Sequence, residues 1–110
     1  LFEGLNHDNE AVRYWAGQGL YNLDEKIGIN TADRLKQKLD DSVINISISA
    51  ARALLKHEFS SKKLEEILSL GLEAENEWTR LQTALVLDDF QSVLRGLENQ
   101  AHNQINTDPN

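Results

Sequence analysis

Asn9-Glu10-Ala11-Val12-Arg13-Tyr14-Trp15-Ala16-Gly17-Gln18-Gly19-Leu20 is the stretch of this chain whose layout two later segments repeat. Leu20 lies 34 residues before Leu54, which in turn lies 33 residues before Leu87. The opening Asn9-Glu10-x-x-Arg13 recurs as Asn76-Glu77-x-x-Arg80, and small residues share one register position in all three segments: Ala16, Ala50 and Thr83. A period of this length is typical of stacked pairs of helices.

The repeat therefore predicts an all-α fold, a right-handed α-solenoid of antiparallel helix pairs with about three repeats. The expected divisions are repeats over 1–97, made of a partial first unit at 1–23, a second at 31–57, a third at 60–90 and the start of a fourth at 91–97, followed by a polar, disordered tail at 98–110. The segment 43–48 is β-branched and alternates like a strand, but the repeat register predicts a helix there.

Within the units, the expected helices cover about 10–23, 31–39, 43–56 and 78–90, and another begins at Ser60 or Ser61. Short polar side chains that can accept from free backbone N–H groups mark the helix starts: Asp8 or Asn9, Asn30 or Thr31, and Asn76. Apolar residues at helical spacing are the expected core: Leu5, Val12, Ala16, Leu20, Leu23, Leu35, Leu39, Ile46, Ala50, Ala53, Leu54, Leu64, Ile67, Leu68, Leu72, Leu81, Ala84, Leu85 and Leu87.

Composition excludes several classes of function. The chain of 110 residues has a formal net charge of −7, which disfavours binding to phosphate backbones. It contains no cysteine, so disulfides, thiolate metal sites and cysteine nucleophiles are excluded. No apolar run is long enough to span a bilayer. Leu1 aligns with Leu35, inside a helix, so we expect the sequence to be a piece of a larger polypeptide.

The segment His7-Asp8-Asn9-Glu10-Ala11-Val12-Arg13 resembles the turn and second-helix start of bacterial HEAT repeats. Residues 1–90 also resemble the HEAT-like region C-terminal to the catalytic domain of bacterial sulfatases. The segments that carry this second resemblance are Tyr14-Trp15-Ala16, Ala50-Ala51-Arg52-Ala53-Leu54 and residues 76–88. Ser47 departs from this pattern because it stands where the second-helix arginine would be. A ladder of Asp–Arg pairs along the solenoid would therefore be broken in the middle repeat.

The resemblance implies a non-catalytic accessory segment of a sulfatase-family hydrolase, whose parent protein would be periplasmic or secreted. This segment carries neither the formylglycine motif nor its calcium ligands, so any sulfate-ester hydrolysis would lie upstream. The alternative is an independent HEAT-repeat module for protein–protein interaction. A third hypothesis is an enzyme built on HEAT-like helices, such as a bilin-lyase relative or an alkylpurine DNA glycosylase. The acidic net charge disfavours the DNA glycosylase. The expected partner is an upstream domain of the same polypeptide or another protein, with no nucleic acid and no membrane.

No residue is predicted to be catalytic, to bind a cofactor or to hold a metal. The three histidines are scattered singly, without the spacing of a metal site. The expected interaction surface comprises Arg13, Tyr14, Trp15, Trp78 and Arg80. The arginines could bind an anionic sugar or sulfate, but pairing with turn carboxylates such as Asp8 or Asp41 is the favoured interpretation. The aromatic residues could stack on a carbohydrate, but we expect Trp15 to pack between layers and Trp78 to cover the start of its helix.

Overall fold

A computed structural model describes residues 3–59 and 61–91 of the chain, and all regular structure in them is helical. One 3-10 turn, η1 (Glu3–Asn6), precedes five α-helices: α1 (Glu10–Tyr21), α2 (Ile29–Lys38), α3 (Ile44–Lys56), α4 (Lys62–Leu72) and α5 (Glu77–Asp89). Residues 44–48 form the start of α3 and not a strand, with Val43 directly before the helix, which confirms the prediction from the repeat register. The expected fourth unit beyond residue 91 and the tail at 98–110 lie outside the described residues.

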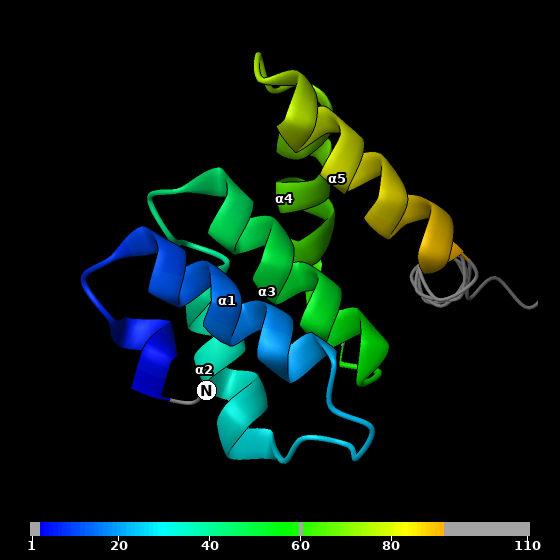
Figure 1. Ribbon diagram of the computed structural model, residues 1–110. Coiled ribbons are helices and arrows are strands. Elements are labelled where there is room, and N and C mark those ends of the chain that lie inside the picture. The colour runs from blue at the N-terminus through cyan, green and yellow to red at the C-terminus, as the bar shows by residue number, and fades with distance from the viewer. Residues whose placement is uncertain (1–2, 60, 92–110) are drawn as a thin grey trace, which may run out of the picture.

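The helices lie in two layers (Figure 1). In one layer α3 packs between α1 and α5, and behind it lie η1, α2 and α4. Contacts between the layers join η1 with α1, α2 with α3, and α4 with both α3 and α5, so each helix of the rear layer contacts the next helix in the chain. On the side turned away from the rear layer α1 and α5 carry exposed side chains, whereas every residue of α3 is buried or partly buried.

The core between the layers contains the leucines that define the period. Leu20 and Leu54 are buried in one hydrophobic cluster, and Leu87 is partly buried against it. Leu5, Leu35 and Leu68, from the rear layer, belong to the same cluster. The small residues that share a register position are buried too: Ala16, Ala50 and Thr83. The burial of Leu20, Leu54 and the three small residues was thus predicted correctly, whereas Leu87 is less deeply buried than its two counterparts.

Several residues expected in the core are exposed instead: Val12, Leu23, Leu72, Leu81, Ala84 and Leu85. On α5 the buried residues are Thr79, Thr83 and Val86. This helix packs on α3 and α4 through that small, partly polar face, which turns Leu81 to the surface with 55% of its area exposed. The error arose because apolar spacing alone did not show which side of α5 would be covered.

Gly17 allows α1 and α3 to approach each other closely. A Cβ atom added there would lie only 2.6 Å from Ser49 Oγ, so α1 and α3 could not pack at this distance with a larger residue. Gly71, near the end of α4, serves the same purpose, because its Cβ would lie 2.2 Å from Thr83 Oγ1 on α5. Glycine at both positions allows helices to contact each other closely.

Asparagine and serine side chains begin three of the helices. Asn9 Oδ1 accepts from Ala11 N at 2.8 Å, Asn76 Oδ1 from Thr79 N at 3.2 Å, and Ser61 Oγ from Lys63 N at 3.2 Å. The prediction for the second unit was wrong: Gly28 precedes α2 without a side-chain cap, because the helix starts earlier than Asn30.

We expect Asn9→Ala to lower the free energy of unfolding by about 1 kcal/mol, since a backbone N–H loses its acceptor. Asn30→Ala is the matched control, because Asn30 lies exposed within α2 and makes no cap. Chemical denaturation of both variants measures the difference. Equal stability of the two variants would contradict the assignment of Asn9 as the cap.

Candidate interaction site

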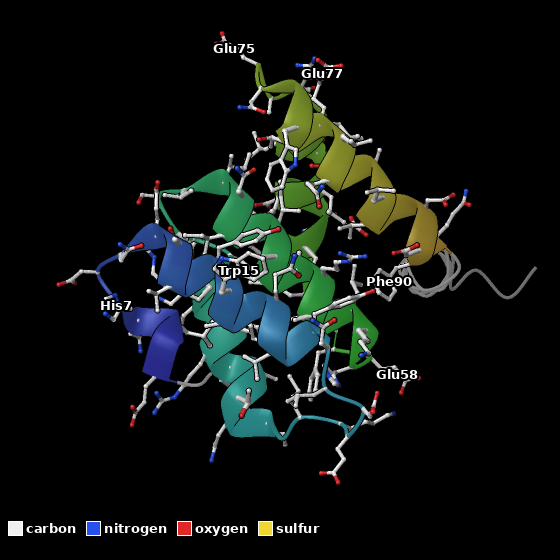
Figure 2. All side chains as sticks on the ribbon, viewed as in Figure 1. His7, Trp15, Glu58, Glu75, Glu77 and Phe90 are labelled. Carbon is white, nitrogen blue, oxygen red and sulfur yellow. The ribbon has the colours of Figure 1, made fainter. Side chains whose placement is uncertain are left out.

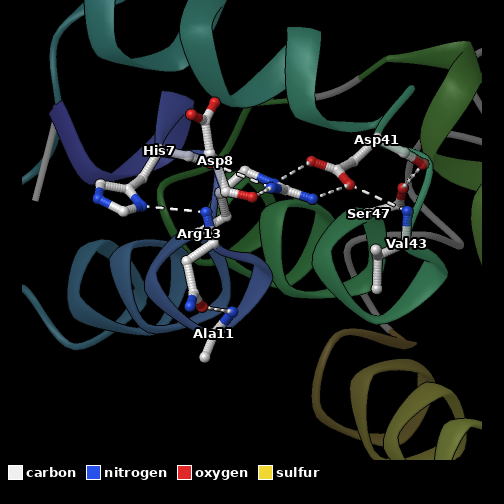
Figure 3. Close-up of polar contacts among 8 residues, drawn as sticks. His7, Asp8, Ala11, Arg13, Asp41, Val43 and Ser47 are labelled. Carbon is white, nitrogen blue, oxygen red and sulfur yellow. Dashed lines mark hydrogen bonds and ion pairs between the residues drawn. The ribbon is translucent and has the colours of Figure 1, made fainter.

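Arg13 joins the turn before α1 to the turn before α3 (Figure 3). Its guanidinium donates to both carboxylate oxygens of Asp41, with Nε–Oδ2 at 3.0 Å and Nη2–Oδ1 at 3.2 Å. Nη1 donates to the backbone carbonyls of His7 at 3.0 Å and Asp8 at 2.8 Å. These contacts engage all three guanidinium nitrogens. Arg13 therefore holds the structure together, as the favoured interpretation had it, and Asp41 provides the carboxylate.

The Asp41 side chain is only 5% exposed and that of Arg13 14% exposed, so the pair is well shielded from water. Burial raises the pKa of Asp41, but the hydrogen bonds from Arg13 and from Val43 N, together with the charges of Arg13 and Lys38, outweigh that effect. The pKa of Asp41 consequently lies below its ordinary value of 3.8. A carboxylate with these donors is stabilised in its charged form.

Arg80 repeats half of this arrangement. It donates from Nη1 to Ala74 O at 2.6 Å and to Glu75 O at 2.8 Å, carbonyls six and five residues before it, which are the same offsets as in Arg13. In the middle segment Ser47 Oγ donates to Asp41 O, six residues before it, at 3.3 Å. The two arginines thus fasten a helix to its preceding turn.

Two neighbouring aromatic side chains of α1, Tyr14 and Trp15, come together with Trp78 of α5, which is distant in the sequence. Tyr14 lies 5.4 Å from Trp15 and 6.1 Å from Trp78 between ring centroids. Trp15 is 67% exposed and Trp78 46% exposed, and Figure 2 shows Trp15 projecting from α1 towards the viewer. The prediction that Trp15 packs between layers was wrong, because α1 turns its opposite side, with Ala16 and Leu20, towards the core.

These aromatic residues line a surface groove with a volume of about 220 Å³. We call it the aromatic groove, and its lining residues come from the first turns of α1, α3 and α5 and the residue before α3: Glu10, Ala11, Tyr14, Trp15, Val43, Asn45, Ile46 and Trp78. Asn45 Oδ1 accepts from the Thr79 hydroxyl at 2.8 Å, a contact that joins α3 to α5. Neither Arg13 nor Arg80 lines it.

Sequence reasoning missed Asn45 as a groove residue, although the repeat contains the signal. Ala11, Asn45 and Trp78 each lie two positions before the corresponding residues Arg13, Ser47 and Arg80. All three line the aromatic groove. Equivalent positions on successive helices of one layer therefore form one surface. The triplet Asn45-Ile46-Ser47, which satisfies the glycosylation pattern, lies within α3, and its asparagine is bonded to Thr79.

A second hollow adjoins the groove and shares Tyr14, Asn45 and Trp78 with it. The side chain of Arg52 lines this hollow, with its guanidinium carbon 4.1 Å from the centre of the Tyr21 ring. Arg52 Nη2 also lies 3.2 Å from Asp89 Oδ2. This cation is therefore held by an aromatic ring and a carboxylate of the chain itself.

The described residues include no cluster of three or more His, Asp or Glu side chains that could hold a metal ion. His7 Nδ1 accepts from Asn9 N at 3.0 Å, and buried His57 lies with Nε2 2.9 Å from Leu20 O. Both histidines contribute to structure, and His102 lies outside the described residues. None of the helices in the described part of the chain has the length and apolar character needed to cross a bilayer. No family model, no curated protein and no solved structure matches this chain.

Proposed function

We propose that this chain is a non-catalytic, HEAT-like segment that binds another polypeptide through the aromatic groove. The observation that carries the proposal is the gathering of Trp15 and Trp78 around Tyr14, with both tryptophans substantially exposed. Tryptophan and tyrosine are enriched among the residues that contribute most to binding energy at protein interfaces. Trp15 and Trp78 both lie near Tyr14 and are not buried in the core. Large apolar side chains gathered on a surface are typical of an interaction site.

The repeat supports the solenoid part of this proposal. Helix pairs that stack with a period of 33 to 34 residues align equivalent positions of their second helices along one face. The shared register of Ala11, Asn45 and Trp78 on the groove has this property. A surface built from successive helices offers an extended contact for a peptide or a folded partner.

The sequence resemblance suggests a more specific form of this proposal, in which the chain is an accessory segment beside a sulfatase catalytic domain. In that form the groove packs against the catalytic domain of the same polypeptide. In the independent form it binds a separate protein. Both forms use Trp15 and Trp78, and both leave the chemistry to residues outside this segment.

Selection of a random linear peptide library on the immobilised chain tests whether the groove binds polypeptide. We expect synthetic copies of the selected peptides to bind the wild type, and Trp15→Ala to weaken them about 30-fold, which is typical of an interface hot spot. Because Trp15 is largely exposed, the melting temperature should change little. Isothermal calorimetry and thermal denaturation measure the two effects.

Ile29→Ala is the matched control, since Ile29 is 71% exposed and does not line the groove. It should leave peptide binding unchanged. If the selected peptides bind Trp15→Ala and the wild type equally, or if the selection enriches no peptide, the proposed function is wrong.

A further inference from the structure

Building on the proposed function, we infer that the aromatic groove receives a cationic side chain, that of an arginine, from the bound polypeptide. The groove offers aromatic rings and a carboxylate together, and a guanidinium is the group that both attract. The inference goes beyond polypeptide binding because it specifies the chemistry of the anchoring residue.

The charges around the groove favour a cation. Glu10 is the one charged residue among its lining side chains in the described part of the chain. The neighbouring hollow contains one cation, Arg52, which is already paired with Asp89 and stacked on Tyr21. The whole chain has a formal net charge of −7, so a basic segment would also be attracted at longer range.

The ring geometry favours a cation over a sugar. The plane of Trp15 is inclined by 80° to that of Tyr14, and the plane of Trp78 by 53°. The three rings therefore do not form the flat platform on which a pyranose face could lie. Inclined rings can surround a compact or planar cation, which is attracted to ring faces within about 6 Å of their centroids. The Glu10 carboxylate adds an acceptor for guanidinium N–H groups on the same groove.

Arg52 demonstrates this chemistry within the chain. Its guanidinium stacks on Tyr21 while a carboxylate, Asp89, binds its edge. The aromatic groove repeats this combination with Tyr14, Trp15 and Trp78 as the rings and Glu10 as the carboxylate. The described residues that line the groove supply no cation to complete the set. A side chain from a partner would complete it.

Nuclear magnetic resonance titration of the whole chain tests the inference, because the sequence contains only two tryptophans and so gives two indole N–H signals. The probes are acetyl-arginine N-methylamide and its neutral isostere, acetyl-citrulline N-methylamide. We expect the arginine probe to shift both indole signals and the citrulline probe to bind about five-fold more weakly, the loss that a missing cation–π contact produces at an exposed site.

Glu10→Gln should weaken the arginine probe about three-fold without changing the response to citrulline, because it removes one charge at partial exposure. Glu65→Gln is the control: it makes the same change on α4, at an exposed residue that does not line the groove. Equal shifts from both probes, no shift of either indole signal, or shifts from glucose but not from arginine would overturn the inference.

These outcomes separate the inference from the proposed function. If the selected peptides require Trp15 for binding but contain no basic residue, the groove still binds polypeptide but the inferred arginine anchor is wrong. Peptides that ignore Trp15 would contradict the proposed function, whatever the arginine probe does.

Discussion

Asp41→Asn is expected to lower the free energy of unfolding at pH 7 by about 2–4 kcal/mol, the largest loss that we predict for this chain. The substitution keeps the shape of the side chain but removes the charge opposite Arg13, which is only 14% exposed. Asparagine can accept from one guanidinium nitrogen, whereas the carboxylate accepts from two. The Arg13 charge would then remain shielded from water without its counter-charge.

The effect should depend on pH in one direction. The pKa of Asp41 is lower in the folded chain than its ordinary value of 3.8, so the unfolded chain takes up the proton first as pH falls. The stabilisation of the fold by the Asp41 carboxylate is therefore fully present above about pH 5. It is lost as pH falls through 3.8 towards the lower pKa of Asp41 in the folded chain. Urea denaturation from pH 7 to pH 3 should show the wild type and Asp41→Asn converging in stability at the acidic end.

Asp24→Asn is the control for charge alone, because Asp24 is exposed in the loop before α2. Its free energy of unfolding should stay within about 0.5 kcal/mol of the wild type. Arg13→Gln combined with Asp41→Asn should cost less than the sum of the two single variants, since the two residues contact each other. Additive losses, or a difference that persists unchanged at pH 3, would contradict the pairing.

Gly71→Ala should lower the free energy of unfolding by about 2–3 kcal/mol, although alanine is the better helix former. The added methyl group would lie 2.2 Å from Thr83 Oγ1, 2.9 Å from Thr83 Cγ2 and 3.1 Å from Ile48 Cδ1. Thr83 is fully buried and its hydroxyl donates to Thr79 O at 2.8 Å, so it cannot turn aside without losing that bond. The helices α4 and α5 would have to move apart.

A second variant makes this explanation specific. In a Thr83→Ala background both of the closest atoms are absent, and the remaining contact is with the flexible end of Ile48. There Gly71→Ala should be neutral or stabilise by up to about 1 kcal/mol through helix propensity. Gly28→Ala is the control, because a Cβ atom at Gly28 meets nothing within 4 Å. A loss in Gly71→Ala that persists in the Thr83→Ala background would show that another cause acts.

The sequence was most informative where one local rule decided the outcome. Asn76 was predicted as a helix cap, and either Asp8 or Asn9 as another; Asn76 and Asn9 are the caps, because the bond from an asparagine oxygen to the next free backbone N–H needs only neighbouring residues. The cap of α2 was predicted wrongly because Gly28 begins that helix without any side-chain signal.

The site was predicted in part. Tyr14, Trp15 and Trp78 were named together, and the structure brings them together, but nothing in their spacing indicated that Trp15 would be exposed. Arg13 and Arg80 were named with them and instead bind turn carbonyls. Arg13 also binds the Asp41 carboxylate, and neither arginine lines the groove. Asn45 became part of the groove through its contact with Thr79 on another helix.

By itself the sequence determined that the described residues fold into helices, where three of these helices begin, and that Leu20 and Leu54 are buried, because helical periodicity and capping act over a few residues. Only the tertiary structure decided which side of α1 and α5 is covered and which aromatic residues meet. That choice depends on how closely whole helices approach each other. The approach is determined by contacts between residues distant in the chain, such as Gly17 with Ser49 and Gly71 with Thr83. Such contacts have no period of their own, so hydrophobic spacing could not reveal them.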